Sequence, residues 1–173
     1  MTSKFNIIET INLCKKNNRD AQSALYQKYS FDLYKYLHFL CGKKELAEDL
    51  VQNTFIKVFR NIGSLKNNEG IKGWIFQIAR NLYFDHLKSA NNSKRDNNEI
   101  NFDQIEDESN QSESVLELKN LLNQLDAKDR DLIILVEISG NSLLEVSEIT
   151  GISLSAVKSR LHRVRKTLNN INK

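Results

Sequence analysis

Apolar residues recur at intervals of three and four along most of the chain, which is the spacing of a helix with one buried side. The clearest example precedes the C-terminus, with the stripe Leu154, Val157, Leu161, Val164 and Leu168. Ser153 stands just before this stripe, where its hydroxyl can cap the first turn. Strand signals are weak and the six glycines lie at apparent breaks between helix-like segments. The pattern therefore predicts an all-α chain.

A second, shorter helix is predicted immediately upstream, in the segment NSLLEVSEITG. Ser142 and Glu145 have the spacing of a capping box, and Gly151 ends the helix. Ser147 and Gly151 are small residues where two helices must cross closely. These features predict a helix-turn-helix with residues 153–168 as its recognition helix. An ordinary helical hairpin with a solvated basic face is the alternative.

The charge of this region favours DNA as its partner. Five basic residues lie off the apolar stripe: Lys158, Arg160, Arg163, Arg165 and Lys166. No acidic residue occurs from Gly151 to the end of the sequence. Because solvated helix faces usually mix both signs, a face of one sign indicates a polyanionic ligand.

The net charge of +3 on 173 residues hides an uneven distribution. Residues 1–95 carry 16 basic and 8 acidic side chains, whereas residues 96–117 carry 8 acidic and no basic ones. The acidic stretch is rich in Asn and Ser, as flexible linkers are. We therefore expect two small helical domains, 1–89 and 115–173, joined by a flexible acidic linker at 90–114. The linker is either a solubilising tether or a mimic of nucleic acid inside a basic channel.

The N-terminal part holds 13 of the 14 aromatic residues. The default prediction for five of them is the core: Tyr26, Tyr29, Phe31, Phe55 and Phe59. In GWIFQIARNLYFDHLKS, Ile75, Ile78 and Leu82 are predicted to follow the buried side of a helix. Trp74, Arg80 and Asn81 lie on its other sides, where they could grip a backbone and stack on a displaced base. Alternatively, Trp74 is a half-buried residue that fixes helix packing.

Two further helices are predicted under the helix-turn-helix. Leucines 118, 121, 122 and 125 form one amphipathic stripe, and an apolar run at 132–138 forms the second.

Several function classes lack their sequence signals. No apolar run approaches membrane-spanning length, and residues 1–20 lack the apolar core of a signal peptide, so we expect a cytoplasmic protein. Cys14 and Cys41 are not closely spaced, and three scattered histidines give no zinc-ligand spacing. No nucleophile with its base and no phosphate-binding glycine loop is evident. We expect no catalysis, no metal and no cofactor.

The motifs AEDLVQNTF, WIFQIARNL and AVKSRLHR carry a family resemblance over most of residues 19–168. The first part of the chain resembles the second conserved region of bacterial RNA polymerase sigma factors, and the last part resembles the fourth. With a short linker between them, the order is that of the extracytoplasmic-function (ECF) subgroup of the sigma-70 family. The resemblance implies an all-α initiation factor that binds core RNA polymerase and selects promoters.

The resemblance implies roles for particular residues. In the family, the AEDLVQ helix binds the clamp helices of the largest polymerase subunit, which here implicates Glu48, Asp49, Gln52 and Asn53. Asn53 replaces the acid that is usual there. A simpler explanation of these acids is the preference for negative charge in the first turns of a helix.

The same region of the family melts the −10 promoter element and holds a flipped base. The resemblance assigns the pocket for this base to Leu65, Phe76 and Asn81. It places Lys66 and Arg80 nearby, where they would contact phosphates, with Trp74 beside them. Leu65 departs from the aromatic residue often found in that loop.

The fourth region of the family reads the −35 element. The resemblance places Lys158, Ser159, His162 and Arg163 in the major groove, and Ser155, Arg160, Arg165 and Lys166 near the DNA backbone.

The implied partners are core RNA polymerase, through the clamp helices and the flap of the second-largest subunit, double-stranded and melted promoter DNA, and an anti-sigma protein. Two alternatives remain. A stand-alone repressor or activator would use the helix-turn-helix without polymerase and would dimerise on a palindrome. A helical adaptor would bind only protein.

Overall fold

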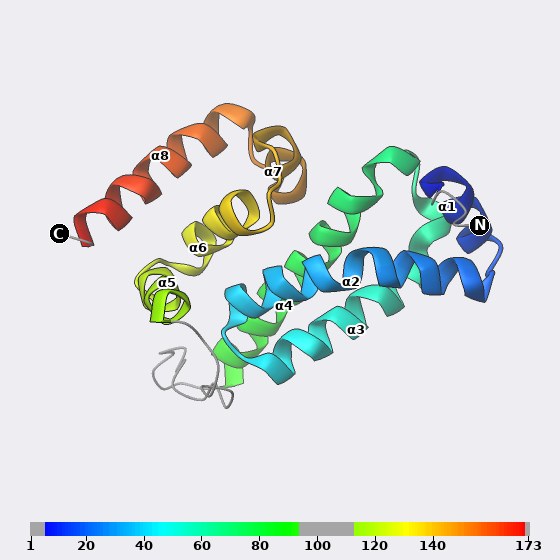
Figure 1. The fold of residues 1–173 in the computed structure, drawn as a ribbon, viewed down its shortest axis with the longest axis horizontal. Helices are drawn as coiled ribbons and strands as arrows, with labels where there is room; N and C mark the ends of the chain where they lie inside the picture. The colour runs from blue at the N-terminus through cyan, green and yellow to red at the C-terminus, as the bar shows by residue number, and fades with distance from the viewer. Residues whose placement is uncertain (1–5, 94–112, 172–173) are drawn as a thin grey trace.

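The structure is a computed structural model that describes residues 6–93 and 113–171, and every regular element in these ranges is helical. The N-terminal domain comprises α1 (Ile7–Lys15), α2 (Arg19–Cys41), α3 (Lys44–Asn61), the 3-10 turns η1 (Ile62–Ser64) and η2 (Asn68–Gly70), and α4 (Ile71–Ser93). The C-terminal domain comprises α5 (Glu113–Asn123), α6 (Ala127–Ile133), the π-helical turn η5 (Ile134–Ile138), α7 (Leu143–Thr150) and α8 (Leu154–Ile171). The two domains lie side by side (Figure 1).

Local sequence signals set the ends of the N-terminal helices. Asn6 and Asn18 accept hydrogen bonds from backbone N–H groups at the starts of α1 and α2. Gly42 ends α2 with a φ of 70°, a left-handed conformation that glycine adopts without strain, so α3 can run back along α2. Helices α2, α3 and α4 pack together around a core that includes Leu33, Tyr36, Leu37, Leu50, Phe55, Val58 and Ile75.

The buried side of α4 differs from the predicted stripe. Ile75 is fully buried, but Ile78 and Leu82 are only partly covered. The side that faces the core is instead formed by Ile71, Ile75, Phe76, Ala79 and Tyr83. The prediction missed this side because alanine and tyrosine are ambiguous in a hydrophobic pattern.

Gly73 lies inside a helix, so the prediction that all glycines lie between helices is wrong at this position. Helix α4 already begins at Ile71, so Gly73 belongs to its first turn. A Cβ atom at this position would stand 3.8 Å from Cγ1 of Ile149, in α7 of the other domain. Gly73 therefore lies where α4 and α7 pack together.

A buried arginine organises the C-terminal domain. Arg130 donates from its guanidinium to the carbonyl oxygens of Leu122, at 2.9 Å, and of Leu125, at 3.0 Å. Leu122 lies in the last turn of α5 and Leu125 lies two residues beyond its end, so these bonds hold the chain where the helix stops. Asp126 then caps α6 by accepting from the N–H groups of Lys128 and Asp129. The connection between α5 and α6 is thus held by side chains as well as by packing.

The apolar run at 132–138 forms the second predicted helix of this domain, but it is not uniformly α-helical. Helix α6 passes into η5 at Ile134, and Ile134 and Leu135 are fully buried. The side-chain amide of Asn141 donates to the carbonyl oxygen of Leu135 at 3.0 Å and so supports the end of the π turn.

The helices overrun the predicted linker boundaries. Helix α4 continues through Ser93, and α5 begins at Glu113. The remainder of the acidic linker, residues 94–112, lies outside the described residues, as do both interpretations of its charge.

The two domains touch along α2 and α4. Helix α7 packs against α4, while α6 and η5 pack against α2 (Figure 1). Within residues 6–93 and 113–171, no helix combines the length and apolar character needed to cross a bilayer.

Candidate nucleic-acid and protein interfaces

Helix α7 begins with the capping box that the sequence predicts. The N–H of Glu145 donates to Oγ of Ser142 at 3.2 Å, and the N–H of Ser142 donates to the Glu145 carboxylate at 2.7 Å. The bond from the Ser142 backbone holds the pKa of Glu145 below its ordinary value. The backbone N–H groups of Ser142 and Glu145, which have no acceptor within the helix, are thereby satisfied.

The turn between α7 and α8 also follows the prediction. Gly151 has a φ of 74° and its N–H donates to the carbonyl of Ser147. The hydroxyl of Ser147 donates to the carbonyl of Ile152 at 2.6 Å, which closes the turn. The hydroxyl of Ser153 accepts from the N–H of Ala156 at 3.2 Å and caps α8. The predicted helix-turn-helix is confirmed.

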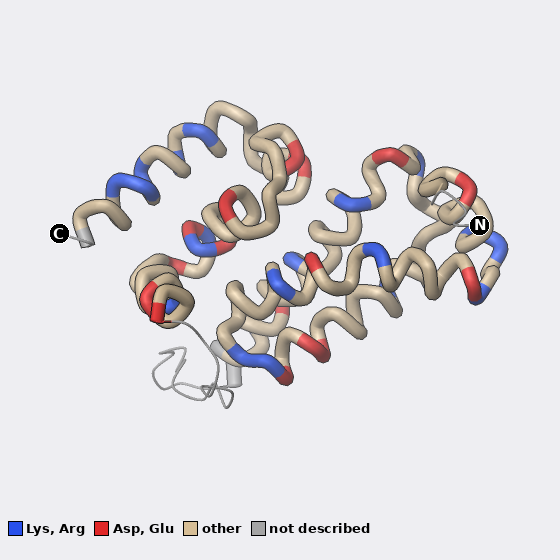
Figure 2. The backbone as a smooth tube through the Cα atoms, in the orientation of Figure 1, with Lys and Arg blue, Asp and Glu red and all other residues tan. Residues whose placement is uncertain are grey.

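Helix α8 has one apolar and one basic face. Val157, Leu161 and Val164 are buried, as the stripe predicts. Seven of the eight residues predicted to contact the −35 element are exposed: Ser155, Lys158, Ser159, His162, Arg163, Arg165 and Lys166. Basic residues follow one another along α8 (Figure 2). The exposed face is thus free of carboxylates along the helix itself.

Two of the arginines of α8 are paired inside their own domain. Arg160 donates from Nε to Asp129 of α6, and its side chain is 27% exposed. Arg165 donates to Glu137 at 2.6 Å, with both side chains about half exposed. A DNA phosphate would have to compete with these carboxylates for both arginines.

Helix α3 presents the four predicted protein-binding residues together. Glu48, Asp49, Gln52 and Asn53 are all exposed, while the other side of the helix is buried. Because α3 begins at Lys44, its first-turn acid is Glu45. Glu48 and Asp49 lie one turn further along α3, where the preference of a helix start for negative charge is weaker.

A hollow of about 400 Å³ lies beside these residues, between α2 and α3, and the sequence interpretation missed it. It is lined by Tyr26, Ser30, Phe31, Tyr34, Glu48, Val51 and Gln52. Phe31 is 68% exposed and Tyr26 is 41% exposed, so the prediction that both belong to the core is wrong. Their helical spacing suggested a core, but it cannot show whether another element covers that face. Exposed aromatic rings of this kind are typical of protein-binding surfaces.

The predicted −10 residues separate into buried and accessible groups. Leu65 is 9% exposed and Phe76 is fully buried, with its ring 5.3 Å from that of Tyr36. Neither side chain offers a surface to a base in this conformation, because both fill the core. Lys66 and Asn81 are exposed, and Trp74 is half-buried. Trp74 packs against the core, as its alternative interpretation predicts.

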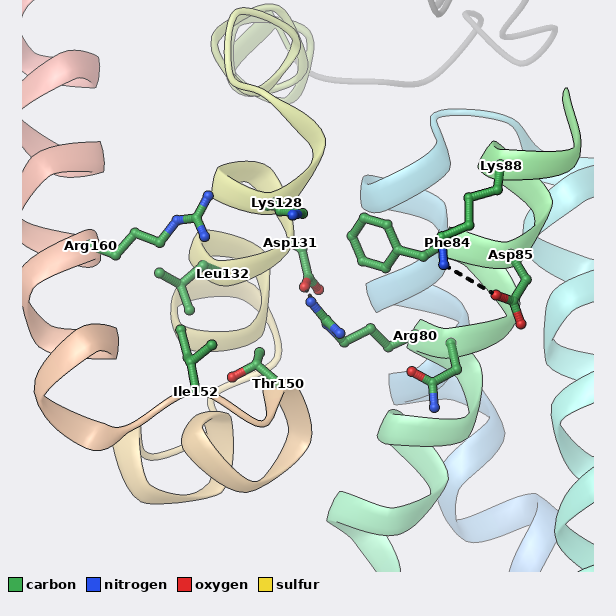
Figure 3. Close-up of a pocket in the computed structure, with 11 residues that line it drawn as sticks. Arg80, Phe84, Asp85, Lys88, Lys128, Asp131, Leu132, Thr150, Ile152 and Arg160 are labelled. Carbon is green, nitrogen blue, oxygen red and sulfur yellow. Dashed lines mark hydrogen bonds and ion pairs between the residues drawn. The ribbon is translucent and has the colours of Figure 1, made fainter. Parts of the chain in front are cut away.

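Arg80 is engaged by the other domain. Its Nε donates to Oδ2 of Asp131 at 2.6 Å, and Figure 3 shows the two side chains pointing toward each other. The hydroxyl of Tyr36 donates to Oδ1 of the same carboxylate at 2.6 Å. The guanidinium carbon also lies 4.7 Å from the ring centre of Phe84. Asp131 is 1% exposed, and burial raises its pKa despite the nearby arginine. Burial likewise raises the pKa of Tyr36 well above its ordinary value.

A cavity of about 620 Å³ adjoins this contact, between α4 and the C-terminal domain. It is lined by Arg80, Asn81, Phe84, Asp85, Lys88, Lys128, Asp131, Leu132, Thr150, Ile152 and Arg160 (Figure 3). Residues predicted for the two promoter elements, Asn81 and Arg160, therefore line one space in this conformation.

The C-terminal domain carries a separate apolar groove of about 220 Å³. It is lined by Leu118, Leu121, Leu122, Ile133, Glu137, Ile138, Arg165, Leu168 and Asn169. The leucines of α5 were predicted to pack under the helix-turn-helix, and Leu122 does so, but Leu118 is 37% exposed. The apolar face of α5 is only partly covered by its own domain.

The two cysteines are buried and free, and burial raises the pKa of Cys41 to about 11. Among the described residues, no cluster of three or more His, Cys, Asp or Glu side chains could hold a metal ion.

Each of the two domains matches the model of a known protein family. Residues 25–93 match the family model of sigma-70 region 2, and residues 116–168 match that of sigma-70 region 4. The chain is 30% identical to the ECF RNA polymerase sigma factor SigW of Bacillus subtilis, over 94% of each chain. It is 29% identical to the ECF sigma factor BldN of Streptomyces coelicolor, but spans only 64% of that protein's length.

Solved structures show the same fold. The sigma factor RpoE of Bartonella quintana, in complex with the anti-sigma factor NepR, matches with a TM-score of 0.73 and 26% identity, over 86% of this chain and 94% of that one. CnrH, in complex with the cytosolic domain of CnrY, matches with a TM-score of 0.71 and 21% identity over 94% of each chain. With both family regions present in order, the chain belongs to the extracytoplasmic-function RNA polymerase sigma factors.

Proposed function

We propose that this chain binds core RNA polymerase in the cytoplasm and directs it to promoters by recognising −35 and −10 elements and helping to open the duplex. The observation that carries the proposal is the exposed basic face of α8, held at the end of a capped helix-turn-helix and free of acidic residues along its length. In this account the polymerase performs the chemistry, and the chain contributes no catalytic group, metal or cofactor.

The −35 element is bound by the exposed side of α8. Lys158, Ser159, His162 and Arg163 reach base edges in the major groove, while Ser155, Arg160, Arg165 and Lys166 contact the backbone. Spacing supports the division, because positions 158, 162 and 165 share one side of the helix and 159, 163 and 166 share the adjacent side. Lysine and arginine can donate to guanine, and phosphate contacts fix the register of the helix.

The −10 element is opened by the N-terminal domain. Asn81, which is exposed, donates to and accepts from the edge of a flipped base, while Lys66 and Arg80 contact phosphates. Trp74 lies on the same helix and offers part of an indole ring. Leu65 and Phe76 support this surface from the core rather than touching the base. Flipping costs a few kcal/mol, which these contacts must offset.

Core polymerase is bound through α3 and the neighbouring hollow. Glu48, Asp49, Gln52 and Asn53 form the polar part of the surface facing the clamp helices of the largest subunit. The exposed rings of Phe31 and Tyr26 add apolar area beside the acids. In protein interfaces, aromatic residues are enriched in the buried centre and polar residues surround them at the rim.

The apolar groove of the C-terminal domain is the candidate site for the flap of the second-largest subunit. Leu118, Leu121 and Leu168 leave apolar surface open to a partner. The complex of RpoE with NepR supports a further partner for this chain, an anti-sigma protein.

A test of polymerase binding separates this function from a stand-alone DNA-binding regulator. Asp49→Arg reverses the charge at the centre of the exposed face of α3 without touching the core, so affinity for purified core polymerase should fall at least about tenfold, as charge reversal in an interface costs several kcal/mol. Titration of core enzyme with labelled protein measures the loss.

Glu148→Arg is the matched control, because Glu148 is also exposed but lies on α7. It should bind core polymerase like the unchanged chain. Equal affinity of Asp49→Arg and the unchanged chain would remove α3 from the interface, and no binding of either would favour the stand-alone regulator.

A further inference from the structure

The first helix, α1, packs against both turns of the connection between α3 and α4, residues 62–70, called here the α3–α4 loop (Figure 1). One side chain of α1 is bonded to both parts of this loop. The ammonium group of Lys15 donates to the backbone carbonyl oxygen of Leu65 at 3.0 Å and to Oδ1 of Asn68 at 3.1 Å. These partners lie 50 and 53 positions away, so the bonds require the folded domain.

The two bonds of Lys15 join the two turns of the loop to each other. The backbone bonds of the turns are local: the N–H of Leu65 closes η1, and the N–H of Gly70 closes η2. Lys66, between the turns, is exposed. It therefore lies between the two residues that Lys15 holds, and it is also the loop residue proposed above to contact a phosphate.

Asn12 adds a further bond from the same side of α1, three positions before Lys15. Its Oδ1 accepts from the side-chain amide of Asn68 at 3.3 Å. The amide of Asn68 thus accepts from one residue of α1 and donates to another, which fixes its orientation. Lys15 and Asn68 are half-buried, and a charge-assisted hydrogen bond is stronger where water is partly excluded.

From these contacts, and resting on the function proposed above, we propose that α1 positions the α3–α4 loop for the melted −10 strand, with Lys15 and Asn12 as positioning residues that do not themselves touch DNA. A loop already held in its bound conformation binds more tightly, because its ordering entropy is lost on folding rather than on binding. Helix α1 lies outside residues 25–93, which match region 2, so the proposal extends recognition beyond the matched region.

Hydrogen exchange of the amides of residues 62–70, measured by mass spectrometry on the full chain, tests whether α1 holds the loop. Lys15→Met removes both bonds to the loop, so these amides should exchange about tenfold faster, the effect of losing a charge-assisted hydrogen bond. Asn68→Ala, which changes no charge, should give a smaller increase. Unchanged exchange in both variants would overturn the proposal.

Lys16→Met is the matched control, because Lys16 carries the same charge at the next position of the chain and is exposed. It should leave the exchange of residues 62–70 unchanged. Circular dichroism checks that each variant is folded, and Asn68→Ala is used for both measurements if Lys15→Met does not fold.

Anisotropy of a fluorescent single-stranded DNA oligonucleotide of mixed sequence tests whether this support serves DNA binding. Lys15→Met should bind about threefold to tenfold more weakly than Lys16→Met, the cost of ordering a few side chains on binding. The slopes of log affinity against log salt concentration should be equal in these two variants, because a positioning residue adds no phosphate contact. Lys66→Ala should instead lower the magnitude of the slope by about 0.7, the value for one phosphate of a single strand.

The outcomes separate the positioning role from the proposed function. A slope lowered by about 0.7 in Lys15→Met relative to Lys16→Met would show direct contact with DNA and overturn the positioning role. Equal affinities of these two variants, despite faster exchange in the loop, would overturn it as well. Unchanged affinity and slope in Lys66→Ala would instead count against the proposed −10 surface, whereas the support of the loop by α1 is decided by hydrogen exchange alone.

Discussion

Several side chains proposed for recognition also take part in packing, and their burial and hydrogen-bond partners distinguish the two uses. Phe76 and Leu65 are core residues whose burial removes them from direct contact with a base. Arg160 of α8 is paired with Asp129 of α6 and is 27% exposed, whereas Lys158 of the same helix is exposed. Substitutions of these two basic residues should therefore have different consequences.

Lys158→Ala should weaken promoter binding without changing stability, because its side chain is exposed. Because Lys158 is assigned to a base edge, its loss should lower the discrimination between promoter sequences by about 1 to 3 kcal/mol. Arg160→Ala should weaken binding and also lower the free energy of unfolding, because it leaves Asp129 without its partner. Titration with different promoter sequences and denaturant unfolding of both variants measure these effects, and a loss of stability in Lys158→Ala would contradict the assignment.

The helix-turn-helix is the element most completely specified by its own residues. A capping box starts α7, a left-handed glycine ends it, and a serine starts α8. All of these signals act within a few positions of one another, which is why the sequence predicts this element well. The hollow between α2 and α3 could not be predicted in the same way, because the exposure of Phe31 depends on which helices surround α2.

Ser142→Ala should lower the free energy of unfolding by about 1 kcal/mol at pH 7, the usual cost of losing an N-cap. The pKa of Glu145 is lowered in the folded protein, so its contribution is full above its ordinary pKa and is lost as pH falls through the lowered value. Because alanine keeps the backbone N–H that donates to Glu145, both the variant and the unchanged chain should lose this contribution in acid, and the difference between them should change little with pH. Denaturant unfolding at several pH values measures it.

Ser23→Ala is the control, since Ser23 is exposed inside α2 and alanine suits a helix interior. It should be neutral or slightly stabilising at every pH. A Ser142→Ala variant as stable as this control would show that the capping box contributes little to α7.

The molecule combines two domains. The contact between them involves Arg80, which is one of the residues proposed to bind the −10 element. The two family regions and their order follow from sequence, because each domain has its own motifs. The contact of Asp131 with Tyr36 and Arg80 could not be predicted, since the partners are 95 and 51 positions away and Asp131 lies in a segment with other acids. Its burial depends on how the domains dock.

Promoter-directed transcription is the central claim, and mapping RNA 5′ ends tests it most directly. Purified core RNA polymerase is incubated with fragmented genomic DNA from the source organism, with and without this protein. We predict new start sites that share two spaced upstream motifs, one near −35 and one near −10. With an active polymerase and intact DNA binding in a parallel control, the absence of new starts would contradict the claim.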